Sequence, residues 1–352
     1  MIERNYNKGG IDLMKKGLSL VMIFLLSISI LAGCNFEKKE IYNIATASTG
    51  GTYYPIGVGM GQLWTEHYRD QNIKFNGQSS AGSVENIDLM KNGEADMSIL
   101  QNLISTQAYE GSGVFEGNEY KDLRAIGMIW PNVEHFVLMN GKVETGDISD
   151  IEGNSFSVGP QASGTEQSTM TMMEGIGLDK SNIRPEYLGY DDTISSMRDG
   201  RLDGGSLPAG VPVSAITDML ASNLNASILE VTEEQLNEIN KVANAWYPYT
   251  IEAGTYPRQE EDIQTIAQPN VLVATPEMDA EFVYDLTKIL FENQEFMIGV
   301  HNSAREMKVE TALEGLNTPL HAGAYQYFEE QGLDIPENLK PVELDEGAEN
   351  NE

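Results

Sequence analysis

Three short loops rich in glycine and serine carry the residues best suited to chemistry in this sequence. They are 48–55 (STGGTYYP), 79–83 (SSAGS) and 161–166 (QASGTE). Each follows an apolar run and precedes apolar residues at helical spacing, so its backbone amides should lie at the start of a helix. Such amides have no partner within the helix and carry partial positive charge. A single loop of this kind can be a tight turn without a ligand, but three in this setting predict a cleft that binds an anion.

Side chains in and near these loops allow more than one role. Ser163 and Thr165 can offer hydroxyl contacts, whereas Glu166 stands three residues after Ser163 and is expected to cap the helix. Tyr53 and Tyr54 can stack on a ligand or fill the space under the first loop, and one of the two is expected in the core. A fourth loop, 203–211 (DGGSLPAGV), supplies either packing glycines or a further wall of the cleft.

The remaining residues do not assemble a convincing catalytic set. Segment 77–81 (GQSSA) fails the nucleophile-elbow pattern at its last position. Segment 57–62 (GVGMGQ) lies inside a predicted helix and lacks the third glycine of a dinucleotide fingerprint. We therefore expect a protein that is not an enzyme, with no catalytic residue, no metal and no cofactor. The four histidines are scattered without the spacing of metal ligands: His67, His135, His301 and His321.

Apolar patterning predicts strands that alternate with helices, the elements that must position these loops. The alternation is typical of an α/β fold with parallel sheets and helices on both faces. No internal repeat of short fixed period is present. The expected strands are 41–47, 73–78, 95–100, 123–129, 136–139, 156–159 and 270–274, and the expected helices are 54–68, 83–91, 102–109, 165–175, 192–198, 213–221, 279–292 and 318–332.

The N-terminal segment has the pattern of a lipoprotein signal peptide. Lys15 and Lys16 precede an apolar run over 18–32, which ends in small residues before Cys34. The run is shorter than the roughly 20 residues that span a bilayer, so a membrane helix is the weaker interpretation. We expect 1–33 to be the signal peptide and Cys34 to carry the lipid.

Other features bound the mature chain. Met14 directly precedes the two lysines and is a possible true start, 34–40 is expected as a linker, and the acidic tail 342–352 as disordered. Because Cys34 is the only cysteine, no intramolecular disulfide can form. The net charge of −32 excludes nucleic acid as a partner and indicates a well-solvated surface. A chain of this length usually divides into two domains.

Several segments resemble the TAXI family, the extracytoplasmic solute receptors of TRAP transporters. The similarity covers 45–64, 78–101, 163–166, 199–216 and 319–332, and the loop STGGTYYP is its most specific part. The resemblance implies an α/β, type II periplasmic-binding-protein-like fold of two lobes with a ligand cleft between them. It also implies a ligand such as glutamate, glutamine or a related dicarboxylate. Carried onto this sequence, the ligand-binding residues are Ser48, Gly50, Gly51, Thr52, Tyr53, Ser80, Gly82, Gln101, Ser163, Gly164, Thr165 and Gly210.

This chain departs from the family pattern at a few positions. Ser48 and 161–162 stand where glycine or alanine is usual, and Asn102 stands where aspartate is expected. These differences bear on the identity of the ligand more than on the fold.

The expected organisation follows from the resemblance. Residues 41–131 and 251–341 should form lobe I, and 132–250 lobe II, because the chain of such proteins crosses twice between its lobes. The expected function is capture of a small organic anion by lobe closure and its delivery to TRAP membrane subunits, outside the cytoplasm, with the protein anchored to the cell membrane by lipid. The alternative, a ligand-binding sensor lobe that signals to a membrane receptor, is not separated from transport by sequence.

Overall fold

The computed structural model describes residues 40–222 and 224–342. The expected signal peptide, Cys34, the linker before residue 40 and the tail after residue 342 lie outside these ranges. The chain divides into two units, Met1–Glu40 and Ile41–Glu352. Across the described part of the chain, no helix combines the length and apolar character needed to cross a membrane.

Two β-sheets organise the unit Ile41–Glu352. In the first sheet the strands run in the order β2-β1-β3-β11, with β4 and β10 both paired with β11, and in the second the order is β7-β6-β8-β5-β9. We call each sheet with its helices a lobe. The first sheet comprises β1 (Ile41–Ala45), β2 (Lys74–Gln78), β3 (Met97–Gln101), β4 (Arg124–Val133), β10 (Tyr247–Ile251) and β11 (Ile263–Ala274), and the second comprises β5 (Phe136–Met139), β6 (Ser155–Ser157), β7 (Arg184–Glu186), β8 (Gly204–Ser206) and β9 (Ala226–Leu229).

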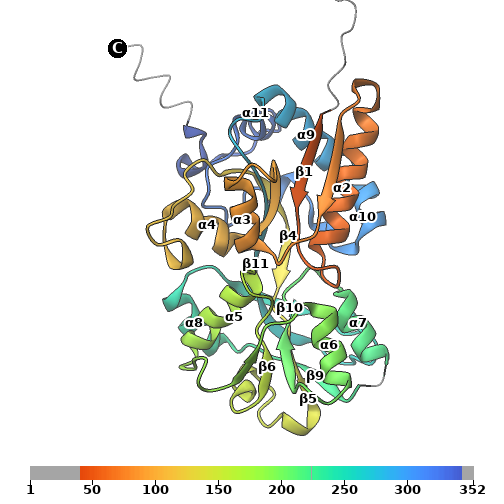
Figure 1. The fold of residues 1–352 in the computed structure, drawn as a ribbon, viewed down its shortest axis with the longest axis vertical. Helices are drawn as coiled ribbons and strands as arrows, with labels where there is room; N and C mark the ends of the chain where they lie inside the picture. The colour runs from red at the N-terminus through yellow and green to blue at the C-terminus, as the bar shows by residue number, and fades with distance from the viewer. Residues whose placement is uncertain (1–39, 223, 343–352) are drawn as a thin grey trace, which may run out of the picture. The chain divides into compact units, whose positions relative to one another are not determined.

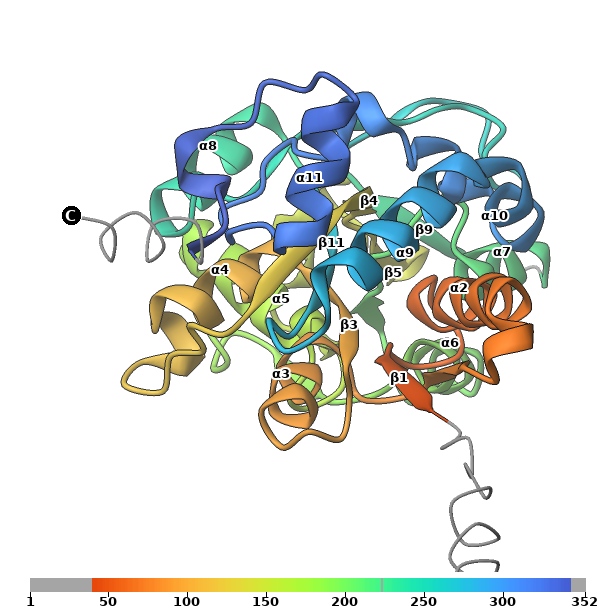
Figure 2. The same cartoon turned by 90° about the horizontal axis from the view of Figure 1, so that it is seen from above.

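Helices accompany both sheets (Figure 1). In the first lobe α9 and α11 pack side by side (Figure 2). The predicted fold class, α/β with two lobes, is confirmed. The helices of the first lobe are α2 (Tyr53–His67), α3 (Ser83–Lys91), α4 (Asn102–Glu110), α9 (Ala280–Glu292), α10 (Gln294–Val300) and α11 (Ala322–Glu330), and those of the second are α5 (Gly164–Gly175), α6 (Tyr190–Arg198), α7 (Ser214–Ala221) and α8 (Glu233–Val242).

The two sheets share one arrangement, although the sequence shows no repeat. In the first, β1 is parallel to β2 and β3, and β11 runs antiparallel between β3 and β4. In the second, β6 is parallel to β7 and β8, and β5 runs antiparallel between β8 and β9. Since parallel strands end at the same edge of a sheet, the loops that follow them in each lobe gather at one edge.

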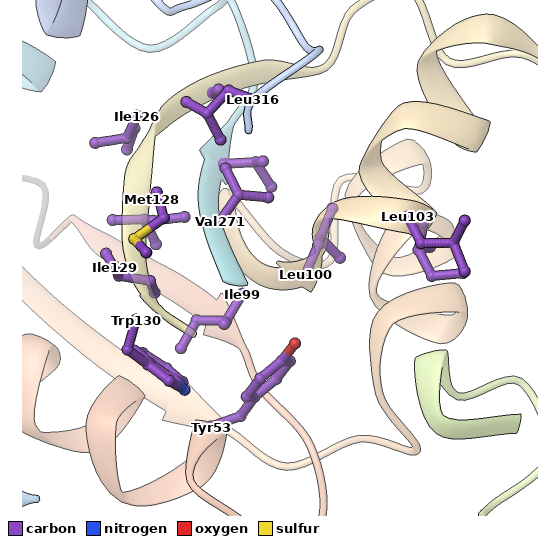
Figure 3. Close-up of a cluster of buried hydrophobic side chains, with 14 of the residues drawn as sticks. Tyr53, Ile99, Leu100, Leu103, Ile126, Met128, Ile129, Trp130, Val271 and Leu316 are labelled. Carbon is purple, nitrogen blue, oxygen red and sulfur yellow. The ribbon is translucent and has the colours of Figure 1, made fainter. Parts of the chain in front are cut away.

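The central strands are buried because helices cover both faces of the first sheet. All five residues of β3 are buried, as expected of a parallel strand with both faces covered. Figure 3 shows apolar side chains of β3, β4 and β11, among them Ile99, Met128 and Val271, gathered near Tyr53 and Trp130. This core holds the strand ends, and therefore their loops, in fixed positions.

Some predicted boundaries differ from the observed ones for local reasons. The predicted strand 270–274 is the second half of β11, which begins at Ile263 and buries polar residues such as Thr265, whose hydroxyl donates to the Glu134 carbonyl at 2.8 Å. The predicted helix 318–332 begins only at Ala322, because His321 caps it by accepting from the Gly323 amide at 3.2 Å.

The chain passes between the lobes along β4 and β11, whose facing segments 131–133 and 267–269 we call the crossing ribbon. Pro131 stands opposite Pro269 in this ribbon, so neither residue can donate a ladder hydrogen bond there. The return passage leads into β10, and the lobe boundary expected between residues 250 and 251 falls inside that strand.

Two buried titratable residues follow the crossing ribbon. Glu134 is fully buried, and its Oε1 accepts from Trp246 Nε1 at 2.9 Å. Burial raises the pKa of Glu134 to about 8. His135 is also fully buried, its Nε2 lies 2.8 Å from the Tyr256 hydroxyl, and burial lowers its pKa to about 4. Both side chains are therefore mainly uncharged at pH 7.

Replacing Glu134 by glutamine should make stability less sensitive to alkaline pH. The folded state holds the proton more tightly than the unfolded state, whose Glu pKa is near 4.5, so this stabilisation is complete below pH 4.5 and is lost as pH rises through about 8. Glutamine mimics the protonated acid. The free energy of unfolding of each protein is measured by urea denaturation. The value for Glu134→Gln minus that for wild type should rise by on the order of 4 kcal/mol between pH 5 and pH 9.

The exposed Glu277 offers the matched control for this change. Glu277→Gln should track wild type across the same pH range. A Glu134→Gln curve that also stays parallel to wild type would show that Glu134 is ionised in the folded protein.

Candidate functional site

A small cavity lies where the loops at the strand ends of the two lobes meet. Its volume is about 30 Å³. Its wall contains amide, hydroxyl, aromatic and small side chains but no lysine, arginine, histidine, aspartate or glutamate. The lining residues are Ala47, Ser48, Gly51, Thr52, Tyr53, Ala81, Gly82, Ser83, Gln101, Asn132, Pro160, Ser163, Gly164, Thr165, Tyr190 and Pro208.

Five helices begin at this cavity. From the first lobe come α2, α3 and α4, which directly follow β1, β2 and β3, and from the second come α5 and α6, which follow β6 and β7. Each helix start leaves N–H groups without partners inside the helix and carries a partial positive charge. With no cationic side chain in the wall, main-chain dipoles are what the cavity offers to a negative charge.

The structure brings most of the predicted site residues together. Ser48, Gly51, Thr52, Tyr53, Gly82, Gln101, Ser163, Gly164 and Thr165 all line the cavity.

The other three predicted residues lie outside the lining and have contacts of their own. Gly50 packs against Asp191, whose Oδ1 would lie 2.5 Å from a Cβ at that position. The Ser80 hydroxyl donates to the Thr46 carbonyl at 3.0 Å, and the Gly210 carbonyl accepts from the Thr52 hydroxyl at 3.1 Å.

Glu166 caps α5, as the sequence predicts. The Ser163 hydroxyl accepts from the Glu166 amide at 3.0 Å, and the Glu166 carboxylate accepts from the Ala162 amide at 3.0 Å. The carboxylate thereby pairs with an amide of its own loop.

Two tyrosines form walls of the cavity. The Tyr53 hydroxyl donates to Asn270 Oδ1, and its ring meets the Trp130 ring edge-on with centroids 5.8 Å apart (Figure 3). The Tyr190 hydroxyl donates to the Pro208 carbonyl at 2.6 Å and lies 3.0 Å from Thr165 Oγ1. Burial raises the pKa of both phenols above the ordinary value, so both stay neutral.

Two side-chain amides in the lining have unpaired polar atoms. Gln101 is 3% exposed and Asn132 is fully buried. Among the described residues no hydrogen-bond partner is present for Gln101 Oε1 or Asn132 Nδ2. A buried polar atom without a partner costs about 1–3 kcal/mol, so each of these atoms favours a partner that enters the cavity.

Sequence reasoning missed several lining residues for identifiable reasons. Asn132 lies on β4, which continues past the predicted strand end at residue 129, and Tyr190 opens a helix predicted to begin at residue 192. The others adjoin the predicted loops in the chain or in space: Ala47, Ala81, Ser83, Pro160 and Pro208.

The lobes touch where α3 and α5 begin. The Glu85 amide of the first lobe donates to the Ala162 carbonyl of the second at 2.9 Å. A Cβ on Gly164 would lie 2.8 Å from Gln101 Oε1 and 2.8 Å from Ser83 Oγ. At the observed approach of the lobes, a side chain at Gly164 would force the Gln101 and Ser83 side chains to shift or the lobes to separate.

The fold and the site define an α/β protein of two lobes with a polar, uncharged cavity between them. The chain belongs to the NMT1-like family, which matches residues 44–332.

Similar solved structures have low sequence identity. The periplasmic aliphatic sulphonate-binding protein SsuA from Escherichia coli is 13% identical, with 83% of each chain covered and a TM-score of 0.46. PhnD1 from Prochlorococcus marinus, in complex with methylphosphonate, is 10% identical over 77% of this chain and 92% of its own, with a TM-score of 0.49. A putative L-cystine ABC transporter protein from Listeria monocytogenes is 10% identical over 78% of this chain and 98% of its own, with a TM-score of 0.45.

Replacing Gly164 by alanine should hold the lobes apart. The added methyl group meets Gln101 and Ser83 across the lobe contact, while the backbone of Gly164 needs no unusual conformation. We expect small-angle X-ray scattering to give a larger radius of gyration than for wild type, with an unchanged circular-dichroism spectrum. Gly299→Ala is the control, because a Cβ there meets nothing within 4 Å. Identical scattering from Gly164→Ala and wild type would refute the predicted opening and show that the Gln101 and Ser83 side chains move aside instead.

Proposed function

We propose that this protein is an extracytoplasmic solute receptor that closes its two lobes over a small organic anion. The convergence of five helix starts from both lobes on a cavity without charged side chains carries the proposal. Helix starts are suited to carboxylate or phosphate groups. Following the TAXI resemblance, the receptor serves a TRAP-type transporter, and the ligand is glutamate, glutamine or a related dicarboxylate. The protein binds this ligand without transforming it.

Ligand recognition is shared between the lobes in this proposal, and the lobes must separate further to admit a ligand of this size, because the cavity of about 30 Å³ has room for only a few water molecules. The carboxylate accepts hydrogen bonds from the amides of the first loop, at Gly51 and Thr52, and the start of α5, at Ser163 to Thr165, completes the shell. A ligand that contacts both lobes only when they are closed binds the closed form more tightly. It therefore shifts the population toward that form, which the membrane subunits recognise.

The strongly acidic surface is compatible with an anionic ligand. The net charge is −32, but at ~0.15 M salt the screening length is ~8 Å, so distant carboxylates have little effect inside the cavity. Helix dipoles act at close range. Inside the cavity the dielectric constant is lower than in water, so their interaction with a charge is stronger there.

A panel of candidate ligands tests the proposal by thermal unfolding. The purified full chain, kept in mild detergent because of its apolar run at 18–32, is heated with L-glutamate, L-glutamine, 2-oxoglutarate, succinate, phosphate or sugars. A ligand at ~100 times its dissociation constant adds ~2.7 kcal/mol, which raises the melting temperature by a few degrees. We expect such a shift with an amino acid or dicarboxylate; a shift with sugars alone would contradict an anion receptor.

Gly51→Asp, tested in the same assay, should abolish that shift without unfolding the protein. The new carboxylate enters the cavity wall next to Tyr190, whose Cε2 would lie 3.2 Å from the added Cβ, and repels an anion. Gly141→Asp adds the same charge at an exposed site with nothing within 4 Å and should keep the shift. A normal shift with Gly51→Asp would show that the first loop does not hold the ligand.

The proposed anchor is testable separately, since Cys34 is the single cysteine. A bacterial host that processes lipoproteins is fed radiolabelled fatty acid. We expect label on the wild-type chain and on the control Ser27→Ala, and none on Cys34→Ser. Label retained by Cys34→Ser would place the lipid elsewhere or refute the anchor.

A further inference from the structure

Two buried side-chain amides are the most specific polar groups that the cavity wall offers. Gln101 is the last residue of β3 and directly precedes α4. Asn132 lies on β4 in the crossing ribbon. Gln101 Oε1 and Asn132 Nδ2 lack partners within the described chain. Every other polar group of the wall is a hydroxyl or the main chain. Each amide carries both a donor and an acceptor.

The cavity is equipped for one negative charge rather than two. A single anionic group can lie on the helix starts of the glycine loops, where main-chain amides meet it. A second carboxylate in the same enclosed space would have no lysine, arginine or histidine beside it in the wall. Burying an unpaired charge is far more costly than burying a hydrogen-bonded neutral group.

An acidic side chain beside the first loop adds to the cost of a second negative charge. Asp191 lies against Gly50 at the edge of this loop and accepts from the Thr49 hydroxyl at 3.3 Å. A carboxylate in this place repels a dianion more strongly than a monoanion.

A carboxamide matches the two side-chain amides better than a carboxylate does. Its NH₂ group can donate to an amide oxygen such as Gln101 Oε1, and its carbonyl can accept from an NH₂ group such as Asn132 Nδ2. A carboxylate only accepts, so it can pair with Asn132 Nδ2 but leaves Gln101 Oε1 without a donor, whereas Asn132 Oδ1 already accepts from Asn270 Nδ2 at 3.4 Å. A site built to hydrogen-bond one group discriminates strongly against an analogue that leaves its buried polar atoms unpaired.

From these observations we propose that the cavity selects a ligand with one anionic group and one carboxamide-like neutral group over the corresponding dicarboxylate. Gln101 is the residue that determines this selectivity, because its Oε1 needs a donor, and Asn132 Nδ2 positions the ligand by donating to an oxygen of its neutral group. The inference rests on the proposed function and narrows its ligand class from glutamine, glutamate and dicarboxylates to the glutamine type.

Isosteric pairs of ligands test the selectivity directly. Isothermal titration calorimetry on the full chain in mild detergent at pH 7 compares L-glutamine with L-glutamate, L-asparagine with L-aspartate, and succinamate with succinate. In the pair that binds most tightly, the amide should have a dissociation constant about tenfold lower than the carboxylate. A preference of less than about threefold, or any preference for the dicarboxylate, overturns the selectivity but leaves an anion receptor in place. Absence of binding by all six compounds overturns this inference, and the proposed function falls with it only if no anion of the thermal-unfolding panel raises the melting temperature either.

A variant with a new positive charge checks the assignment to Gln101. Gln101→Lys places an ammonium group in the wall and removes no hydrogen bond of the Gln101 side chain to the described chain. The ratio of the two dissociation constants should move toward the dicarboxylate by about tenfold or more. Gln326→Lys, at an exposed position of α11, adds the same charge and should leave the ratio unchanged.

Folding of the variant is checked by its melting temperature and circular dichroism. An unchanged ratio in a folded Gln101→Lys protein refutes the role of Gln101. If the variant does not fold, the comparison of amide and carboxylate ligands on the wild-type chain still decides the proposal.

Discussion

The convergence of five helix starts on one cavity is the constraint on which the rest of the site depends. Each helix follows a parallel strand, so the shared strand order of the two sheets fixes where the helix starts lie. Side chains are excluded where the helix starts meet: Gly164 lies against Gln101, and Gly82 against Ser163. The cavity is small and uncharged because main chain, rather than long charged side chains, builds much of its wall.

The charge distribution of the protein separates the surface from the cavity. Acidic residues outnumber basic ones by 54 to 22, yet among the described residues none lines the cavity. At the crossing ribbon, burial favours the neutral forms of Glu134 and His135, which removes two charges from the place where the lobes join. Electrostatic interactions within the site are therefore dominated by fixed dipoles, which do not titrate, unlike the side chains of the surface.

The elements that could be predicted from the sequence are those determined by residues that are neighbours in the chain. The glycine and serine loops were recognisable because turn residues between an apolar run and a helical pattern are a local signal, and the predicted helix 83–91 coincides with α3. The four-residue strand β5 was predicted from its apolar run, whereas β7, with the sequence RPE, has no apolar run to recognise, and β9 lies outside the predicted strands.

The remainder of the site depends on tertiary structure. Asn132 enters the site through the pairing of β4 with β11. Tyr190 enters it through its contact with the loop 161–166 of its own lobe, where its hydroxyl meets Thr165. Neither contact has a signature in the neighbouring residues. The unexpected length of β11 has a similar origin, since buried polar side chains such as Thr265 and Gln268 find partners across the chain.

The facing prolines of the crossing ribbon have a mechanical consequence. Opposite residues of an antiparallel ladder alternate between pairs that exchange two hydrogen bonds and pairs that exchange none, and two facing prolines fit only the second kind. The ribbon therefore loses no ladder hydrogen bond at this pair, while each proline ring fixes its own φ and removes a free torsion from the backbone. Asn132 is the next residue after Pro131, so this restricted stretch of backbone and the wall of the cavity are covalent neighbours.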